Sequence, residues 1–156
     1  MKIYKAYYMS KIGMIEVSGN EEGILSVSFI DIEGVAETAR ENIHSSLINC
    51  IEQLDMYFKG NLKEFNIKLN IKGTEFQKKV WSELLKIPFG KTVSYLDIAK
   101  AIGNEKAVRA VGGANNKNKI AIIIPCHRVI GKNGELVGYG GGLDKKEWLL
   151  KHEGAL

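Results

Sequence analysis

The sequence contains little cysteine and no long apolar run. Cys50 and Cys126 are the only thiols among 156 residues, which argues against a disulfide framework and favours a reducing cytoplasm. Neither thiol belongs to a Cys-x-x-Cys pair and the three histidines are scattered, so nothing indicates a metal site.

No apolar stretch reaches the roughly 18 residues that a membrane-spanning helix needs, so no membrane contact is expected. The first residues lack the unbroken apolar core of a signal peptide, so export is not expected.

Charge is distributed unevenly along the chain. Residues 1–70 hold 7 basic and 10 acidic residues (net −3), whereas residues 71–156 hold 15 and 8 (net +7). A basic half beside an acidic half favours a polyanionic partner for the second half. A lysine-rich solvated surface would give the same pattern, so charge needs a motif to support it.

The first seventy residues predict a small sheet and one helix. The segments KIYKAYYMS, GMIEVSG and GILSVSFI alternate in polarity and are separated by glycines, which is typical of a three-stranded meander. From Glu37 to Phe58 the apolar residues recur with helical spacing, and Gly60 follows as a stop. EFNIKLNI alternates again and is expected to return as a strand to the same sheet. Cys50 lies on the helix, where we expect a buried small apolar residue.

The second half predicts a mostly helical domain. Thr74 with Gln77, and Ser94 with Asp97, have the spacing of capping boxes and mark two helix starts. SYLDIAKAIG and EKAVRAVGGANN predict two short helices joined by a glycine-containing turn, the pattern of a helix-turn-helix. An Asn-Gly pair in GKNGEL suits a hairpin turn, and DKKEWLLKHEG predicts a closing amphipathic helix.

A plausible linker, NIKGTEFQ, separates the two halves. We therefore expect an α+β chain of two domains. Residues 1–72 would form a sheet-plus-helix domain, and residues 73–156 a mostly helical, winged-helix-like domain with the helix-turn-helix.

Three reactive side chains stand together directly after an apolar run, in the sequence Pro-Cys-His-Arg. A free thiol has a pKa of about 8.5, so Cys126 needs help to become a nucleophile. Arg128 could stabilise the thiolate with its charge, and His127 could take the proton directly or through a water. Neighbouring residues of an extended strand face opposite sides, so we expect His127 to act through a bridging water or at a bend.

A catalytic base also needs a partner that orients it. Glu147 and Glu153, in the last predicted helix, are the nearest acidic residues in sequence. Taken singly, a buried cysteine or a histidine has an ordinary structural interpretation. Three adjacent reactive groups are costly to bury without a function, so together they favour a site.

Several motifs resemble one family and follow its order. They are FQKKVW, IPFGKTVSY, IGNEKAVRAVGGANN, IPCHRVIG and YGGGLDKKEWLLKHEG. Over residues 74–154 the chain closely resembles the O6-alkylguanine-DNA alkyltransferases, the methylated-DNA–protein-cysteine methyltransferases. The small ribonuclease-H-like companion domain of that family suits the sheet-plus-helix domain expected for residues 1–72.

The resemblance implies a DNA-repair reaction that needs no cofactor. Members transfer the alkyl group of O6-alkylguanine irreversibly to their own cysteine, once per molecule. By this resemblance Cys126 is the acceptor, and His127 removes its proton through a water while Glu153 orients the imidazole. Asn118 would buttress the loop that carries the cysteine, and Tyr95 would protonate the base as the alkyl group leaves.

The resemblance also implies how the chain contacts its partner, double-stranded DNA that carries O6-alkylguanine. A monomer would dock the second helix of the helix-turn-helix in the minor groove, with Arg109 filling the gap left by the flipped base. The other residues implied in contacts with DNA or with the base are Ala107, Ala110, Gly112, Arg128, Val129, Tyr139 and Gly140.

Two other functions remain open from the residues alone. A thiol hydrolase could use Cys126 and His127 on a small molecule or peptide, although the basic helical pair would then have no role. A DNA-binding module could recognise alkyl lesions without repairing them, in which case the thiol of Cys126 would be dispensable.

Overall fold

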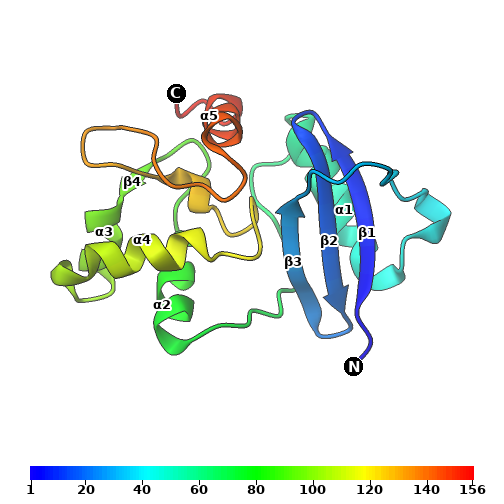
Figure 1. The fold of residues 1–156 in the computed structure, drawn as a ribbon, viewed down its shortest axis with the longest axis horizontal. Coiled ribbons are helices and arrows are strands. Elements are labelled where there is room, and N and C mark those ends of the chain that lie inside the picture. The colour runs from blue at the N-terminus through cyan, green and yellow to red at the C-terminus, as the bar shows by residue number, and fades with distance from the viewer. The chain divides into compact units, whose positions relative to one another are not determined.

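A computed structural model describes all residues from 1 to 156. Its contacts divide the chain into two compact units, Met1–Ile71 and Lys72–Leu156 (Figure 1). None of its helices has the length and apolar character required to cross a membrane. The two units are described separately below.

The first unit is a three-stranded antiparallel sheet covered by one helix. Strands β1 (Tyr4–Ser10), β2 (Gly13–Asn20) and β3 (Gly23–Phe29) follow one another in the sheet in the order of the sequence, which confirms the predicted meander. Helix α1 (Ser45–Phe58) lies along one face of this sheet, as Figure 1 shows. The core between them is built from Ala6, Ile15, Val17, Val27, Leu47, Cys50, Leu54 and Phe58, all at most 1% exposed.

The helix starts later than its periodicity predicts. It begins at Ser45 rather than at Glu37, and a separate 3-10 turn occupies Arg40–Asn42. The boundary is fixed by His44, whose Nδ1 accepts the backbone N–H of Ser46 at 3.2 Å. Histidine is not among the usual capping residues, so the sequence gives no clear start signal at this point.

The predicted fourth strand, EFNIKLNI, is reduced to a single bridge. Ile24 of β3 donates its N–H to the Lys68 carbonyl at 2.9 Å and accepts from the Asn70 N–H at 2.8 Å. Upstream, the side chain of Gln53 on α1 binds both the N–H and the carbonyl of Asn66, at 2.8 and 2.9 Å. Because that helix side chain takes the backbone groups a neighbouring strand would need, the ladder does not extend upstream of Lys68.

The second unit is mostly helical. Its elements are α2 (Glu75–Leu84), β4 (Val93–Ser94), α3 (Tyr95–Ala101), α4 (Val108–Asn116), β5 (Val129–Ile130) and α5 (Leu143–His152). Both predicted capping boxes are present, Thr74 with Gln77 at the start of α2 and Ser94 with Asp97 at the start of α3. They fix where these two helices begin.

The helix-turn-helix consists of α3 and α4. The predicted second helix, residues 105–116, is split into a 3-10 turn (Glu105–Ala107) and α4. Val111, Ala114 and Asn115 of α4 are buried, and the indole N–H of Trp81 on α2 donates to the Ala114 carbonyl at 2.8 Å. The opposite side of α4 is thereby left exposed.

A parallel pairing that the sequence did not predict brings distant segments together. Val93 pairs with Val129 and Ser94 with Ile130, which holds the start of α3 next to the segment after Cys126. The Asn-Gly turn of GKNGEL forms, with Gly134 at φ +82°, but the segments on its two sides do not pair as a hairpin of strands. A two-residue strand carries too little alternation to be read from sequence.

Candidate active site

Cys126 lies at a bend, not on an extended strand. Residues Cys126–Arg128 form a 3-10 turn after Pro125, and the preceding run folds back with Ile122 at φ 71°. The Asn118 side chain braces this run, donating to the Ile124 carbonyl at 2.8 Å and accepting from the Ile120 N–H at 3.0 Å. Asn118 therefore holds the backbone that carries the thiol.

The thiol of Cys126 is buried, with 6% of the residue exposed. Burial raises its pKa. A hydrogen bond with the Asn118 side chain and the charge of Lys146 lower that pKa and oppose the effect, as do the backbone groups of the turn. At neutral pH the thiol is protonated, so it needs a base to react.

His127 is fully buried and is held by Glu153. Its Nε2 lies 2.7 Å from Glu153 Oε2, so Glu153 is the acidic partner of the imidazole. Glu147, the other candidate from sequence, is half exposed and pairs with Lys151 at 3.1 Å. Burial lowers the pKa of His127, although the hydrogen bond and charge of Glu153 raise it in part.

This contact determines which nitrogen of His127 can act as a base. An ionised carboxylate only accepts hydrogen bonds, so Nε2 must carry the proton that Glu153 receives. In a neutral imidazole the other nitrogen, Nδ1, then keeps its lone pair. Nδ1 is buried and has no hydrogen-bond partner in the protein. A free basic nitrogen thus stands one residue from the thiol.

Arg128 is buried and pairs with Glu153. Its Nε and Nη2 donate to the two oxygens of Glu153 at 2.8 and 3.0 Å, and its Nη1 donates to the Ile87 carbonyl at 2.7 Å. The residue is 6% exposed, so the expected contact with DNA or with the flipped base does not fit its position. The expected role beside the thiolate does not fit either, because Glu153 neutralises the guanidinium.

Lys146 is the cation that acts on the thiol, and sequence reasoning missed it. It is fully buried, and its ammonium donates to the carbonyls of Val129 and Val137 at 2.6 and 2.7 Å. Burial lowers its pKa to about 8, and the charge of Cys126 opposes that effect. A signal existed, because Lys146 lies three and four residues before the buried Leu149 and Leu150, on the same face of α5.

Replacing Lys146 by methionine is expected to slow thiol chemistry and to destabilise the fold. Two carbonyls lose a charged donor, which costs about 1–3 kcal/mol of unfolding free energy. The pKa of Cys126 rises because the opposing positive charge is removed. Urea unfolding and the pH dependence of iodoacetamide modification of Cys126 measure the two effects. Lys151→Met, an exposed lysine of the same helix, is the control, and equal behaviour of the two variants would contradict this role.

Tyr95, Gly138 and Asn116 lie close together near the loop after the turn. The hydroxyl of Tyr95 donates to the Val137 carbonyl at 3.0 Å, the same oxygen that Lys146 binds. A methyl group added at Gly138 would lie 3.0 Å from Asn116 Oδ1 and 3.4 Å from the Tyr95 hydroxyl. Glycine at 138 therefore permits a close approach of the loop to α3 and α4.

The remaining predicted pocket residues differ in exposure. The hydroxyl of Tyr139 is buried without a partner, and burial followed by the charge of Cys126 raises its pKa well above the ordinary value. Gly140 is exposed, whereas Val129 is fully buried and contributes its carbonyl to Lys146.

The predicted DNA-facing residues lie on and before the open side of α4. Arg109 and Ala110 are exposed, while Ala107 and Gly112 are half-buried. A side chain at Gly112 would touch the Tyr95 ring, since an added methyl group would lie 4.0 Å from Tyr95 Cδ1. The exposed surface of α4 is therefore continuous with the surroundings of Tyr95.

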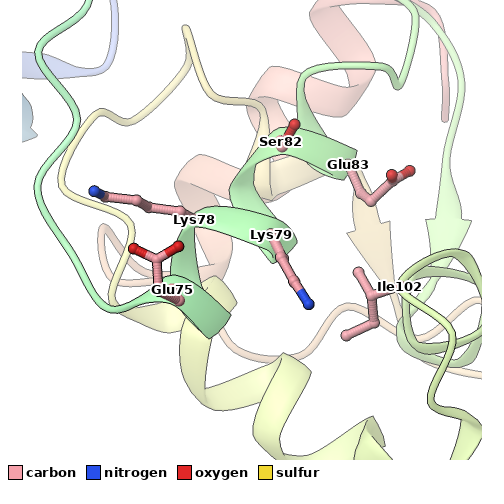
Figure 2. Close-up of a pocket in the computed structure, with 6 residues that line it drawn as sticks. All are labelled: Glu75, Lys78, Lys79, Ser82, Glu83 and Ile102. Atoms are coloured by element: carbon pink, nitrogen blue, oxygen red, sulfur yellow. The ribbon is translucent and has the colours of Figure 1, made fainter.

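Two open hollows of the second unit have no lining residue from the Cys126 turn. One, of about 410 Å³, lies over α2 and the end of α3 and is lined by Glu75, Lys78, Lys79, Ser82, Glu83 and Ile102. Figure 2 shows that carboxylate and ammonium groups both project there, so it has no single charge preference. A second, of about 430 Å³, is lined by Lys72, Gly73, Gln77, Trp81, Lys117 and Lys119. No group of three or more His, Cys, Asp or Glu side chains is placed to hold a metal ion.

The sequence models of two domains of one protein family together match almost the whole chain. Residues 75–155 match the DNA binding domain of 6-O-methylguanine DNA methyltransferase, and residues 3–71 match its ribonuclease-like domain. The chain belongs to this methyltransferase family. The predicted family and the predicted α+β architecture, a ribonuclease-like sheet domain and a helical DNA-binding domain, are confirmed.

Individual members of the 6-O-methylguanine DNA methyltransferase family match over nearly their full length. The methylated-DNA–protein-cysteine methyltransferase of Methanosarcina acetivorans is 51% identical over 155 residues, which cover 98% of this chain and 99% of the relative. The crystal structure of the Mycobacterium tuberculosis O6-methylguanine methyltransferase is 41% identical, with a TM-score of 0.85 over 99% of this chain and 94% of that one. The M. tuberculosis protein has also been solved in complex with DNA, with a TM-score of 0.84, 41% identity, and coverage of 96% and 91%.

Proposed function

We propose that this chain repairs O6-methylguanine in DNA by moving the methyl group onto the sulfur of Cys126. The observation that carries the proposal is the buried thiol directly before His127 in one turn, where Nδ1 of the imidazole is free and Nε2 is held by Glu153 at 2.7 Å. Family membership supports the substrate, since the matching relatives are named as methyltransferases that act from methylated DNA to a protein cysteine.

The reaction balances with the chain's own groups. His127 Nδ1 takes the thiol proton, directly or through a water, and the sulfur attacks the methyl carbon. The C–O bond breaks as the S–C bond forms, and the electron pair stays on the guanine. The hydroxyl of Tyr95 turns from the Val137 carbonyl to the base and gives it a proton, which makes the base a better leaving group. The proton that His127 took from the thiol then restores the phenol. The product is restored guanine and an S-methyl cysteine, a thioether that no group in the site cleaves, so each molecule reacts once.

Access to the methyl group requires the base to leave the duplex. A stacked base cannot reach a thiol that is 6% exposed, and extrusion costs a few kcal/mol. The exposed side of α4 offers Arg109 together with small residues, which suits close approach to a groove and insertion of one side chain. A relative of the same architecture has been crystallised with DNA. We place the chain in the cytoplasm, where both free thiols would remain reduced.

Arg109→Ala is expected to slow repair of duplex DNA by about 10- to 100-fold, because the vacated stack is no longer filled. Transfer from the free base O6-methylguanine, which needs no flipping, should stay unchanged. Single-turnover rates on the two substrates measure this split. Lys106→Ala is the matched control and should only weaken DNA binding and its salt dependence. Equal loss on free base and duplex would contradict a role for Arg109 in flipping.

The proposal is tested by titrating duplex DNA carrying O6-methylguanine with the unmodified protein and digesting the DNA to nucleosides. We expect one lesion to disappear per protein molecule, with guanine appearing in equal amount. Binding without loss of the lesion would favour a lesion-recognition module. Repeated turnover of an ester or peptide, with no change in the DNA, would favour a thiol hydrolase.

A further inference from the structure

One of the two open hollows of the helical unit is lined by charge of a single sign. Its volume is about 430 Å³, and its lining residues are Lys72, Gly73, Gln77, Trp81, Lys117 and Lys119. The three lysines are exposed, and no carboxylate belongs to the lining. The volume of this lysine hollow falls within the range of roughly 300–1,000 Å³ that is typical of small-molecule sites.

The lysines of the lysine hollow have no anionic partner in the protein. No ion pair joins Lys72, Lys117 or Lys119 to a carboxylate, whereas the exposed Lys86 and Lys151 each pair with a glutamate three or four positions earlier. Like charges around one hollow repel one another, and an anion bound between them removes that repulsion.

The other hollow, over α2, has a different charge pattern. There Lys78 and Lys79 occur together with Glu75 and Glu83, as Figure 2 shows. Carboxylates repel the anion that the lysines attract, so this hollow has no preference for an anion. Two lysines in a hollow of similar volume therefore provide a control for the lysine hollow.

The buried part of the lysine hollow is held by contacts between its own elements. Trp81, 3% exposed, donates its indole N–H to the Ala114 carbonyl at 2.8 Å. Gly73 lies directly against the indole, since an added methyl group would lie 2.5 Å from Cζ3 of Trp81. Gln77 accepts the Thr74 N–H through Oε1 at 3.0 Å, which leaves its NH₂ group as a donor. The side chains thus offer donors and positive charge around a fixed indole.

We propose that the lysine hollow binds a ligand that carries two or more adjacent phosphate groups. Lysine ammonium groups bind phosphate as point charges, and three of them with one amide NH₂ suit the several charged oxygens of such a ligand. The same chemistry occurs in the backbone of a nucleic acid strand and in a free polyphosphate. Lys117 and Lys119 flank Asn118, which braces the run before Cys126, so a ligand bound to both lysines also steadies that brace.

Calorimetric titration with tripolyphosphate at about 50 mM salt tests the site. We expect one tripolyphosphate to bind per protein molecule. Lys117→Gln combined with Lys119→Gln should weaken binding at least about tenfold, because two charge-assisted contacts are lost. Lys78→Gln combined with Lys79→Gln removes the same charge from the other hollow and should weaken binding by less than about threefold.

A second measurement needs no variant. Acetylation of lysines by a small reagent is followed by peptide mass spectrometry, with and without tripolyphosphate. Lys72, Lys117 and Lys119 should be protected, whereas Lys78 and Lys79 should react as before. Absence of binding, equal weakening in the two double variants, or equal protection in the two hollows would overturn the inference.

Duplex DNA without a lesion distinguishes the two sources of phosphate. If a nucleic acid strand is the ligand, the duplex should displace tripolyphosphate, and Lys117→Gln with Lys119→Gln should lower the salt slope of DNA binding by about two. If a free polyphosphate is the ligand, it should bind together with the duplex and the slope should stay the same. Repair of O6-methylguanine by a protein that binds no tripolyphosphate would refute this site and leave the proposed function intact.

Discussion

Cys126→Ser is expected to abolish methyl transfer completely while leaving the fold and DNA binding in place. A hydroxyl is far less acidic and less nucleophilic than a thiol, and a neutral imidazole cannot ionise it enough to attack an sp³ carbon. Serine is nearly the same size and the site is buried, so packing changes little. Quantifying the lesion in digested DNA after incubation with excess protein measures the effect.

Cys50→Ser is the matched control for this prediction. Cys50 is also buried and free, but it lies in the core of the first unit, where burial raises its pKa to about 12. This variant should lose some stability and still remove one lesion per folded molecule. Residual transfer by Cys126→Ser, or loss of transfer in folded Cys50→Ser, would contradict Cys126 as the acceptor.

Glu153→Gln is expected to have the second largest effect, on stability and on rate together. The substitution leaves the guanidinium of Arg128 buried without its carboxylate, and breaking a buried pair costs about 3–5 kcal/mol. An amide also no longer favours one tautomer of His127, so Nδ1 is not kept free for the thiol. Loss of an oriented base should slow transfer at least about 100-fold. Chemical denaturation and single-turnover rates measure the two effects.

The pH dependence of stability gives Glu153 a separate signature. Burial alone would raise its pKa, but the hydrogen bonds and charges of His127 and Arg128 outweigh burial and lower it. A carboxyl group whose pKa is lower in the folded state stabilises the fold above its unfolded pKa of about 4.3, and that stability is lost as the pH falls below it. The unmodified protein should therefore lose unfolding free energy more steeply below about pH 4.3 than Glu153→Gln does.

Glu147→Gln, an exposed glutamate on the same helix, controls for the loss of a negative charge. It should change the unfolding free energy by less than about 0.5 kcal/mol and leave the transfer rate unchanged. If Glu153→Gln were as stable and as fast as Glu147→Gln, the arrangement of His127, Arg128 and Glu153 would not support the reaction.

The sequence predicted best those features that depend on local spacing. Thr74 with Gln77 and Ser94 with Asp97 place reciprocal hydrogen bonds within one turn, so the two helix starts could be located from residue identity alone. The adjacency of Cys126, His127 and Arg128 was visible for the same reason. The start of α1 was misplaced, because apolar residues before Ser45 continue the helical spacing while His44 supplies an unusual cap.

The sequence could not show how distant segments meet. The contact between Glu153 and His127 crosses 26 positions, and the choice of Glu153 over Glu147 depends on which side of α5 faces the turn. The role of Arg128 was misjudged because adjacency to a cysteine says nothing about which carboxylate the guanidinium meets in the fold.

The central claim is that a methyl group passes from DNA to the sulfur of Cys126, once per molecule. Its most direct test is the intact mass of the protein after incubation with excess duplex DNA carrying O6-methylguanine, followed by peptide mapping. We expect a gain of about 14 Da that stops at one methyl group and maps to the peptide containing Cys126, as S-methylation of one nucleophile requires. An unchanged mass, several methyl groups, or a single methyl group on another peptide would contradict the account.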